Sequence, residues 1–190
     1  MDLLTAIKER RSCRNYLPDP LDDETIRTLL ESAVWAPSPA NNQPWEFIVI
    51  TSPEVKESIF AEAQERRKIL FEKSGWKWLN RYEVDFLKTA PVIVAVVGDP
   101  EKTGADMFLD EGYKAYQHAC AAAIQNMLLT AHSLELGSLW FTLFDKSAMR
   151  RILGVPAEKD PIALICLGKP GGSSFQTPRK DIAEKTTYLR

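Results

Sequence analysis

The sequence is poor in the residues that build disulfides and metal sites. Of its 190 residues only three are cysteine and two are histidine. Cys13, Cys120 and Cys166 form no CxxC pair, and they make no metal-like cluster with His118 or His132. An odd number of scattered cysteines suits a reducing compartment better than a disulfide scaffold. We therefore expect no metal site, no disulfide framework and a cytoplasmic location.

Long apolar runs and an excess of positive charge are also missing. No run reaches the ~18 apolar residues that suggest a membrane span. The first eleven residues are charged and amphipathic, unlike a signal peptide. The formal net charge is −2, which argues against a general nucleic-acid binder, because such proteins are usually basic. These absences favour a soluble protein.

Several common catalytic motifs do not occur. The sequence has no GxGxxG after a strand, no P-loop, no GxSxG and no HExxH. His118 and Cys120 lie two residues apart on a predicted helix and so face different directions, which favours structural roles for both. His132 lies near the end of the same helix, as a cap or a surface residue.

The patterns that are present predict one domain, 1–190, of the α+β or mixed α/β class. Hydrophobic residues make up 45% and charged residues 26%, which is an ordinary globular balance. Periodicity and capping residues predict helices interspersed with four strands. The predicted helices cover 2–10, Asp22 or Asp23 to 36, 53–73, a piece that follows a break at Gly75 and runs to 88, 111–135, and Asp145 to 153. The predicted strands cover 47–50, 92–97, 139–143 and 162–167, with loop at 99–110.

Two basic segments carry the first candidate binding residues. If the segment after the first helix is extended, Arg10, Ser12 and Arg14 point to one side. Two guanidiniums and a hydroxyl then suit a phosphate, because arginine gives forked, charge-assisted donors. The alternative is a set of solvated cations at a helix C-terminus. Arg179, in the polar C-terminal tail, reads by itself as part of a basic surface cluster.

The loop 37–45 carries the second set of candidates. Its sequence is PSPANNQPW, with three prolines and several amides. Amides supply donors and acceptors together, which suits a flat heterocycle that carries both. An ordinary proline-rich turn is the alternative. The tail has few apolar residues, so it is either disordered or ordered against something else, such as a second subunit.

Four stretches, taken in order, resemble the motifs of the nitroreductase family of FMN-dependent oxidoreductases. The first is RRSCRNY at 10–16, and the second is APSPANNQPW at 36–45. The third is LGSLWFT at 136–142, and the last is LGKP at 167–170, followed by PRK at 178–180. Together they span nearly the whole chain, and each alone would be a weak signal.

The resemblance implies FMN as a non-covalent cofactor and assigns roles to these residues. Arg10, Ser12 and Arg179 would hold the phosphate and ribityl chain, with Arg11 alongside. Arg14 would lie near the pyrimidine edge, where a cation stabilises the anionic reduced flavin. The residues expected to reach the flavin from a partner subunit are Pro37, Ser38, Pro39 and Asn41. The residues expected to line it beside N5 are Phe141, Thr142 and Leu143.

The resemblance also implies a nitroreductase-like fold with a mainly antiparallel central sheet flanked by helices. The family forms an intertwined homodimer with the flavins at the subunit interface. NADH or NADPH reduces the flavin, and a nitroaromatic, quinone or similar small acceptor is then reduced in a ping-pong cycle. The protein supplies position and electrostatics, so we predict no catalytic side chain.

Two departures from the family leave the substrate open. The chain is short for the family, and Tyr82 and Asp85 stand where some members place an amide and a lysine at the pyrimidine edge. Trp76 and Trp78 could wall a pocket, although core packing is favoured. The alternatives are another reaction on the same fold (enone reduction, dehalogenation, dehydrogenation of peptide heterocycles or cleavage of reduced flavin), a non-catalytic flavin-binding protein, or a helical module without a cofactor.

Overall fold

Four antiparallel strands form the centre of the protein. The computed structural model describes residues 1–109, 114–172 and 177–189. The strands are β1 (Trp45–Ile50), β2 (Val92–Gly98), β3 (Gly137–Phe141) and β4 (Asp160–Gly168), and they lie in the order β1-β2-β4-β3. The predicted α+β class and the antiparallel sheet are therefore confirmed.

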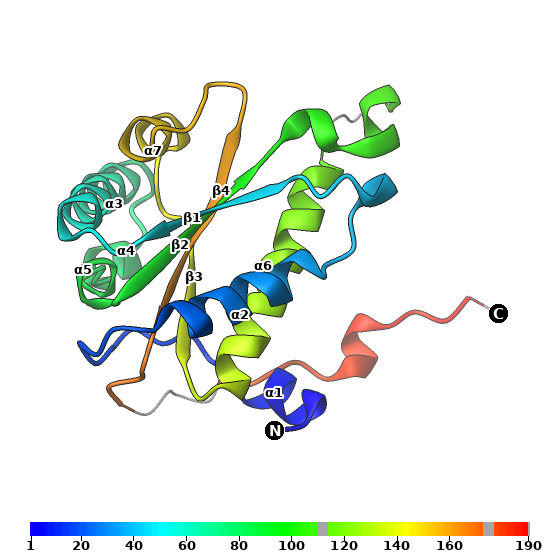
Figure 1. Ribbon diagram of the computed structural model, residues 1–190, viewed down its shortest axis with the longest axis horizontal. Coiled ribbons are helices and arrows are strands. Elements are labelled where there is room, and N and C mark those ends of the chain that lie inside the picture. Colours follow the sequence, from blue (N-terminus) through cyan, green and yellow to red (C-terminus); the bar gives the residue numbers. More distant parts are fainter. Residues whose placement is uncertain (110–113, 173–176, 190) are drawn as a thin grey trace.

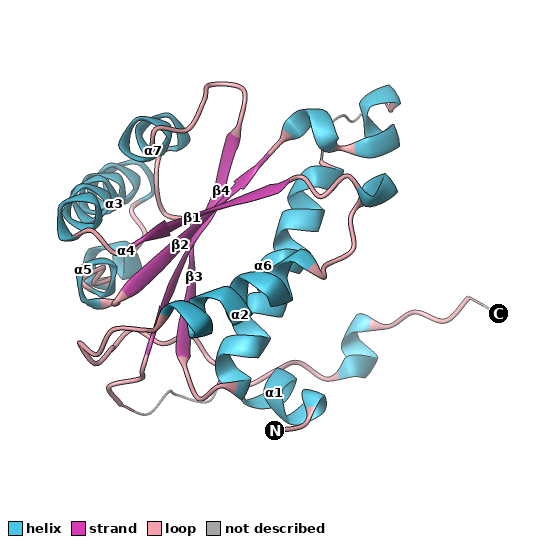
Figure 2. Cartoon of the chain, viewed as in Figure 1, coloured by secondary structure: helices cyan, strands magenta, loops and turns pink. Residues whose placement is uncertain are grey.

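Helices cover both faces of this sheet (Figures 1 and 2). One layer contains α2 (Asp23–Val34) and α6 (Ala115–Ser133). The other contains α3 (Pro53–Ser74), α5 (Phe86–Thr89) and α7 (Lys146–Leu153). The two remaining α-helices among the described residues are the N-terminal α1 (Leu3–Glu9) and the short α4 (Lys77–Arg81), which follows α3.

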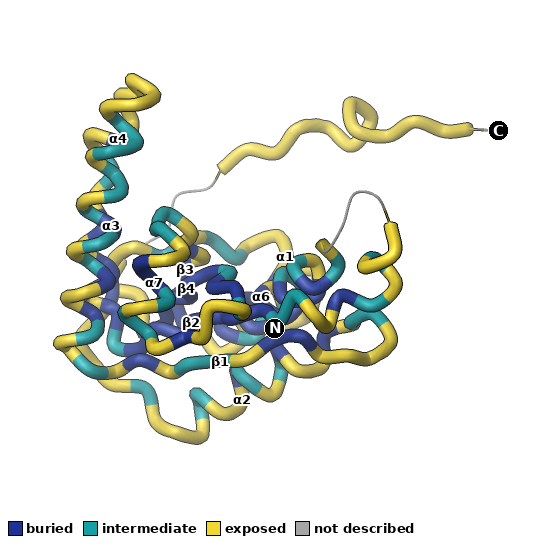
Figure 3. The backbone as a smooth tube through the Cα atoms, turned by 90° about the horizontal axis from the view of Figure 1, so that it is seen from above, coloured by how far each residue is buried: buried dark blue, intermediate teal, exposed yellow. Residues whose placement is uncertain are grey.

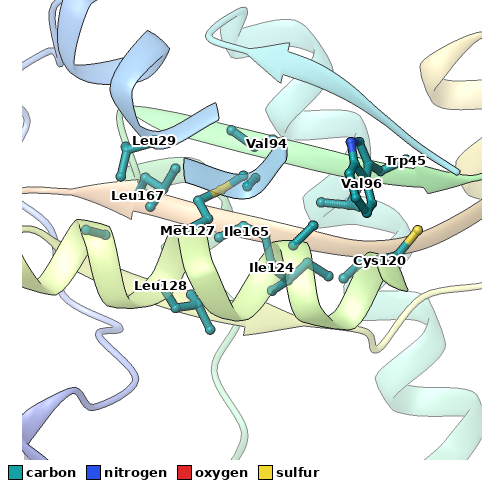
Figure 4. Close-up of a cluster of buried hydrophobic side chains, with 14 of the residues drawn as sticks. Leu29, Trp45, Val94, Val96, Cys120, Ile124, Met127, Leu128, Ile165 and Leu167 are labelled. Atoms are coloured by element: carbon teal, nitrogen blue, oxygen red, sulfur yellow. The ribbon is translucent and has the colours of Figure 1, made fainter. Parts of the chain in front are cut away.

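Alternating residues of the central strands build two separate cores. Val94 and Val96 of β2 face α2 and α6, whereas Ile93 faces α3, α5 and α7. Both central strands are thus buried on both faces, which explains their continuous apolar sequence. In Figure 4, Ile124 and Met127 of α6 lie against this sheet. Burial of one such side chain stabilises the fold by roughly 1.5–3 kcal/mol.

Helix boundaries follow the predicted capping residues. The side chains of Asp22, Ser52 and Asp145 accept hydrogen bonds from the backbone N–H groups at the starts of α2, α3 and α7, as N-cap residues do. Gly75 ends α3 as predicted, with φ of 66°. The helix that we expected after it, to 88, is instead two short helices, because the chain leaves the helical path between α4 and α5.

Other boundaries also differ from the prediction. The expected start of α6 at 111 lies outside the described residues, and the described helix begins at Ala115. The loop 99–110 contains two 3₁₀ turns, Pro100–Lys102 and Gly104–Phe108. Strands β1 and β4 begin two residues earlier than expected, because pairing with β2 extends to Gly98.

The prediction of a strand at 139–143 is wrong by two residues. Strand β3 begins at Gly137 because Glu135 turns the chain through a left-handed conformation, with φ of 61°, directly after α6. Gly137 pairs with Gly168, and Phe141 pairs with Leu164 at the other end. Thr142 and Leu143 consequently lie in the turn between β3 and α7.

The C-terminal tail leaves the body of the chain (Figures 1 and 3). Every residue described in 177–189 is exposed, and a 3₁₀ turn forms at Ile182–Lys185. Ile182 is 78% exposed and Leu189 is 96% exposed. Within its own chain this segment therefore buries no apolar side chain. None of the helices that the structure describes has the length and apolar character to cross a bilayer.

Candidate functional site

The N-terminal basic segment lies along the edge strand β3. Ser12 forms a parallel bridge with Ser138, and the backbone N–H of Cys13 donates to the Ser138 carbonyl over 2.9 Å. Glycine is required at 137, because a Cβ there would lie 2.6 Å from the Cys13 Sγ. Residues 10–14 are thereby fixed against the start of β3, the strand that follows α6.

Arg10 lies within electrostatic range of Arg11 in the same N-terminal segment and of Arg179 from the C-terminal tail. Burial and, after it, the charges of Arg11 and Arg179 lower the pKa of Arg10. None of the three forms an ion pair with a carboxylate in the described parts of the chain. Arg11 and Arg179 instead donate to nearby backbone carbonyls. The structure thus brings together Arg179 and the N-terminal arginines, which are far apart in the sequence.

Unsatisfied polar atoms lie in the same region. The Nε of Arg11 and the Oγ of Ser138 are buried and have no hydrogen-bond partner among the residues that the structure describes. A buried donor without a partner typically costs about 1–3 kcal/mol. A phosphate beside the three guanidiniums would supply both negative charge and acceptor oxygens. The chemistry of this arginine cluster, Arg10, Arg11 and Arg179, therefore fits a phosphate-bearing ligand.

Arg14 has a different environment from the arginine cluster. Its guanidinium carbon lies 5.6 Å from the centre of the Tyr82 ring, within the range of a cation–π contact. The Tyr82 carbonyl accepts a hydrogen bond of 2.7 Å from Arg67 of α3. Asp85 was expected, like Tyr82, at the pyrimidine edge of the flavin. Its side chain is exposed, and its Oδ1 lies 3.9 Å from Lys88 Nζ.

The turn after β3 presents only part of its expected lining. The Phe141 side chain is buried and packs edge-on against Phe86 at 5.6 Å, so only its backbone can reach a ligand. Thr142 is exposed and Leu143 is half-buried. Helix α3 fixes this turn, because Glu62 Oε1 accepts a hydrogen bond of 2.9 Å from the backbone N–H of Asp145.

The loop 37–43 has a strained and defined backbone. Ala40, Asn41 and Gln43 have φ values of 49°, 55° and 45°, and each such non-glycine conformation costs of order 1–3 kcal/mol. The Ser38 hydroxyl accepts from the Gln43 N–H over 3.0 Å, and the Asn41 amide oxygen accepts from the Gln43 side chain over 3.3 Å. Pro37 and Asn41 are exposed. Strain of this kind clusters at ligand sites.

Within one chain, this loop and the arginine cluster lie at opposite ends of α6 (Figure 1). Pro39 contacts Gly104 in the turn whose Asp106 accepts the Ala115 N–H at the start of α6. The N-terminal segment instead lies against Gly137, just beyond the end of α6. The 19-residue helix is roughly 28 Å long at 1.5 Å per residue. The structure therefore does not bring the two halves of the predicted site together in one subunit.

The favoured packing of Trp76 and Trp78 in the core is wrong. These side chains are 60% and 52% exposed. They lie where α3 and α4 form an arm that stands out from the body (Figure 3). Tryptophan is apolar enough to favour burial from sequence alone, whereas its exposure depends on how far this arm extends.

The cysteines and histidines lie outside the set of residues that makes up the arginine cluster. Cys120 and Cys166 are buried and, like Cys13, free, and burial raises the pKa of all three thiols. His118 is exposed, and His132 is half-buried in the last turn of α6. The residues that the structure describes include no group of three or more His, Cys, Asp or Glu side chains that could hold a metal.

Three features of the region were missed from the sequence. Ser138 lies inside the stretch 136–142, but its burial without a partner depends on the fold. On α3, Glu62 accepts a hydrogen bond from the turn after β3, and Arg67 donates one to the Tyr82 carbonyl. Contacts between residues so far apart leave no local signal in the sequence.

The fold and the arginine cluster together define an α+β protein with an edge suited to a phosphate-bearing ligand. Residues 7–169 match the family model described as "Nitroreductase family". The chain therefore belongs to the nitroreductase family, and the resemblance seen in its motifs is confirmed.

Individual relatives cover most of the chain. It is 32% identical to a Methanothermobacter thermautotrophicus protein provisionally named NADH dehydrogenase/NAD(P)H nitroreductase, over 90% of this chain and 78% of the relative. It is 30% identical to a 5,6-dimethylbenzimidazole synthase of Rhodospirillum rubrum, over 85% and 78%. The crystal structure of a nitroreductase with bound FMN from Desulfitobacterium hafniense superimposes with a TM-score of 0.79 at 23% identity and covers 100% of both chains.

Proposed function

We propose that this protein is an FMN-dependent oxidoreductase that works as a homodimer in the cytoplasm. The observation that carries the proposal is the arginine cluster. Among the described residues its three cations form no ion pair with a carboxylate, and the buried Arg11 Nε and Ser138 Oγ have no hydrogen-bond partner. Because the chain belongs to the nitroreductase family, we propose FMN as the phosphate-bearing ligand. Residues 1–190 would act as one FMN-binding unit.

The residues at β3 would bind and orient the cofactor. Arg10, Arg179 and the exposed Ser12 would hold the phosphate and ribityl chain, with Arg11 beside them. Arg14 would place its positive charge at the pyrimidine edge. The backbone of 141–143, in the turn fixed by Glu62, would lie beside N5. FMN, when bound, supplies the two-electron chemistry between a nicotinamide donor and an acceptor.

A second copy of the chain would complete the site. The loop with Pro37, Ser38, Pro39 and Asn41 lies about the length of α6 away from the arginine cluster of its own chain, so it would serve the site of the other copy. The exposed tail, with Ile182 and Leu189, would lie on that copy too. Exposed apolar residues on α1, among them Leu3 and Leu4 at 65% each, add surface that a partner would cover.

NADH or NADPH would be the electron donor, and a nitroaromatic, quinone or similar small molecule the acceptor. The name of the Methanothermobacter thermautotrophicus relative supports this choice. The test follows NADH and NADPH oxidation by the flavin-loaded dimer with and without a nitroaromatic or a quinone. Stimulated oxidation is expected. Tight FMN binding without oxidation of either nucleotide would instead indicate a flavin-binding protein that does not turn over.

Cleavage of the reduced flavin is a second candidate. The similarity to a 5,6-dimethylbenzimidazole synthase, at 30% identity, favours it specifically. Under this alternative, FMN would be consumed when the loaded protein is held with NADH in air. The reductase proposal predicts that the flavin absorbance returns fully once the nucleotide is exhausted.

A further inference from the structure

We infer that Tyr82 is a positioning residue that holds Arg14 beside the flavin and so favours the reduced cofactor. The inference rests on the proposed function, because it needs FMN at the site. It concerns a position where this chain departs from the amide and lysine that some members use.

The charged end of Arg14 contacts the aromatic ring of Tyr82. Arg14 is exposed, and it forms no ion pair with a carboxylate in the described parts of the chain. Its guanidinium carbon lies 5.6 Å from the centre of the Tyr82 ring. An exposed arginine otherwise samples many rotamers. The ring restricts that freedom without neutralising the charge, which remains available to a ligand.

The Tyr82 ring is itself held on two sides. Trp78 lies edge-on at 5.7 Å and Phe86 at 6.1 Å between ring centres. The backbone is fixed as well, because Arg67 donates to the Tyr82 carbonyl over 2.7 Å. Helix α3 thus fixes the backbone, the neighbouring rings fix the Tyr82 ring, and that ring fixes Arg14.

The position of this charge matters more for one redox state than for the other. Reduction places negative charge on the pyrimidine edge of a flavin, whereas the oxidised ring system is neutral there. A cation held at that edge favours the reduced cofactor. A mobile Arg14 would give a weaker preference, so loss of the Tyr82 ring should act on the ratio of affinities for reduced and oxidised FMN.

The test measures this ratio from the midpoint potentials of free FMN and of FMN bound to the dimer. Tyr82→Leu is expected to lower the preference for reduced FMN by about two- to fivefold, the range of an exposed cation–π contact. Tyr82→Phe keeps the ring and should retain the preference. Phe60→Leu is the matched control, since it removes a cation–π contact elsewhere, with Lys88 Nζ 3.8 Å from the ring centre, and should leave the preference unchanged.

A double-mutant comparison separates positioning from general damage. Arg14→Gln should lower the preference by itself, and Tyr82→Leu should add nothing in that background. If Tyr82→Leu has the same effect with and without Arg14, the ring acts independently and the inference is wrong. If it weakens binding of both redox states equally, its role is structural and the inference is also wrong.

Failure of the inference can be told from failure of the proposed function. A wild-type protein that binds no FMN overturns both. A wild-type protein that binds FMN and is reduced by NADH or NADPH, with a preference unchanged in Tyr82→Leu, overturns only the role of Tyr82.

Discussion

Replacement of Arg10 by glutamine should have opposite effects on ligand binding and on the protein without ligand. In the flavin-free chain, burial and the neighbouring charges of Arg11 and Arg179 already disfavour the Arg10 cation. Removal of the Arg10 charge relieves that repulsion, and glutamine keeps an aliphatic stem with a polar end. The midpoint of thermal unfolding of the flavin-free protein should therefore stay the same or rise.

Binding of FMN should weaken strongly in the same variant. A hydrogen bond to a charged group contributes about 1.5–3 kcal/mol, so the dissociation constant should rise roughly 10- to 150-fold. Fluorescence titration of flavin-free protein with FMN measures this change. Riboflavin, which lacks the phosphate, should bind Arg10→Gln and wild type alike.

Arg27→Gln is the charge-matched control for this experiment. Arg27 is exposed on α2, and the one ion pair that it forms with the described residues is a surface contact of 3.7 Å between its Nε and Glu31 Oε1, so its loss should leave FMN binding unchanged. Equal weakening of riboflavin and FMN by Arg10→Gln would refute the reasoning, because the arginine would then act on something other than the phosphate. A fall in the unfolding midpoint of the flavin-free variant would refute the repulsion argument.

Three further predictions concern the elements around the site. Gly137→Ala should weaken FMN binding, because the new Cβ would push residues 10–14 off β3; Gly154→Ala, strained by a φ of 66° but open to solvent, should lower only the unfolding midpoint. Deletion of 177–190 should convert the dimer to monomers on gel filtration and abolish FMN binding; a dimer that keeps FMN would contradict the role of the tail. Capping hydrogen bonds lower the pKa of Asp145 in the folded protein. The ionised carboxylate therefore stabilises the fold fully above its unfolded-state pKa, near 3.8, and this stabilisation is lost as pH falls through the lower folded-state pKa. Unfolding of Asp145→Asn should accordingly depend less on pH below about 4 than unfolding of the wild type does.

Much of the fold could be predicted from local patterns. The capping roles of Ser52 and Asp145, the buried strands β2 and β4, and the order of the elements all come from residues close in sequence. The start of β3 could not be predicted, because it depends on the turn at Glu135 and on the pairing of Gly137 with Gly168, 31 residues further on. Strand ends are set by a distant partner rather than by local composition.

The sequence likewise predicts some residues of the candidate site and not others. The motifs identify Arg10, Ser12 and Arg179, and the structure gathers the arginines. The contact of Arg14 with Tyr82 was not predictable, since it joins residues 68 positions apart through the packing of α3, α4 and α5. For Trp76 and Trp78, composition favours burial, whereas the arm exposes them.

The visible absorption spectrum of the purified protein, recorded before and after anaerobic addition of NADH and then of NADPH, tests the central claim most directly. The account predicts a flavin spectrum, present as purified or after reconstitution with FMN, that bleaches with at least one nucleotide. A protein that stays colourless after reconstitution with FMN would contradict it.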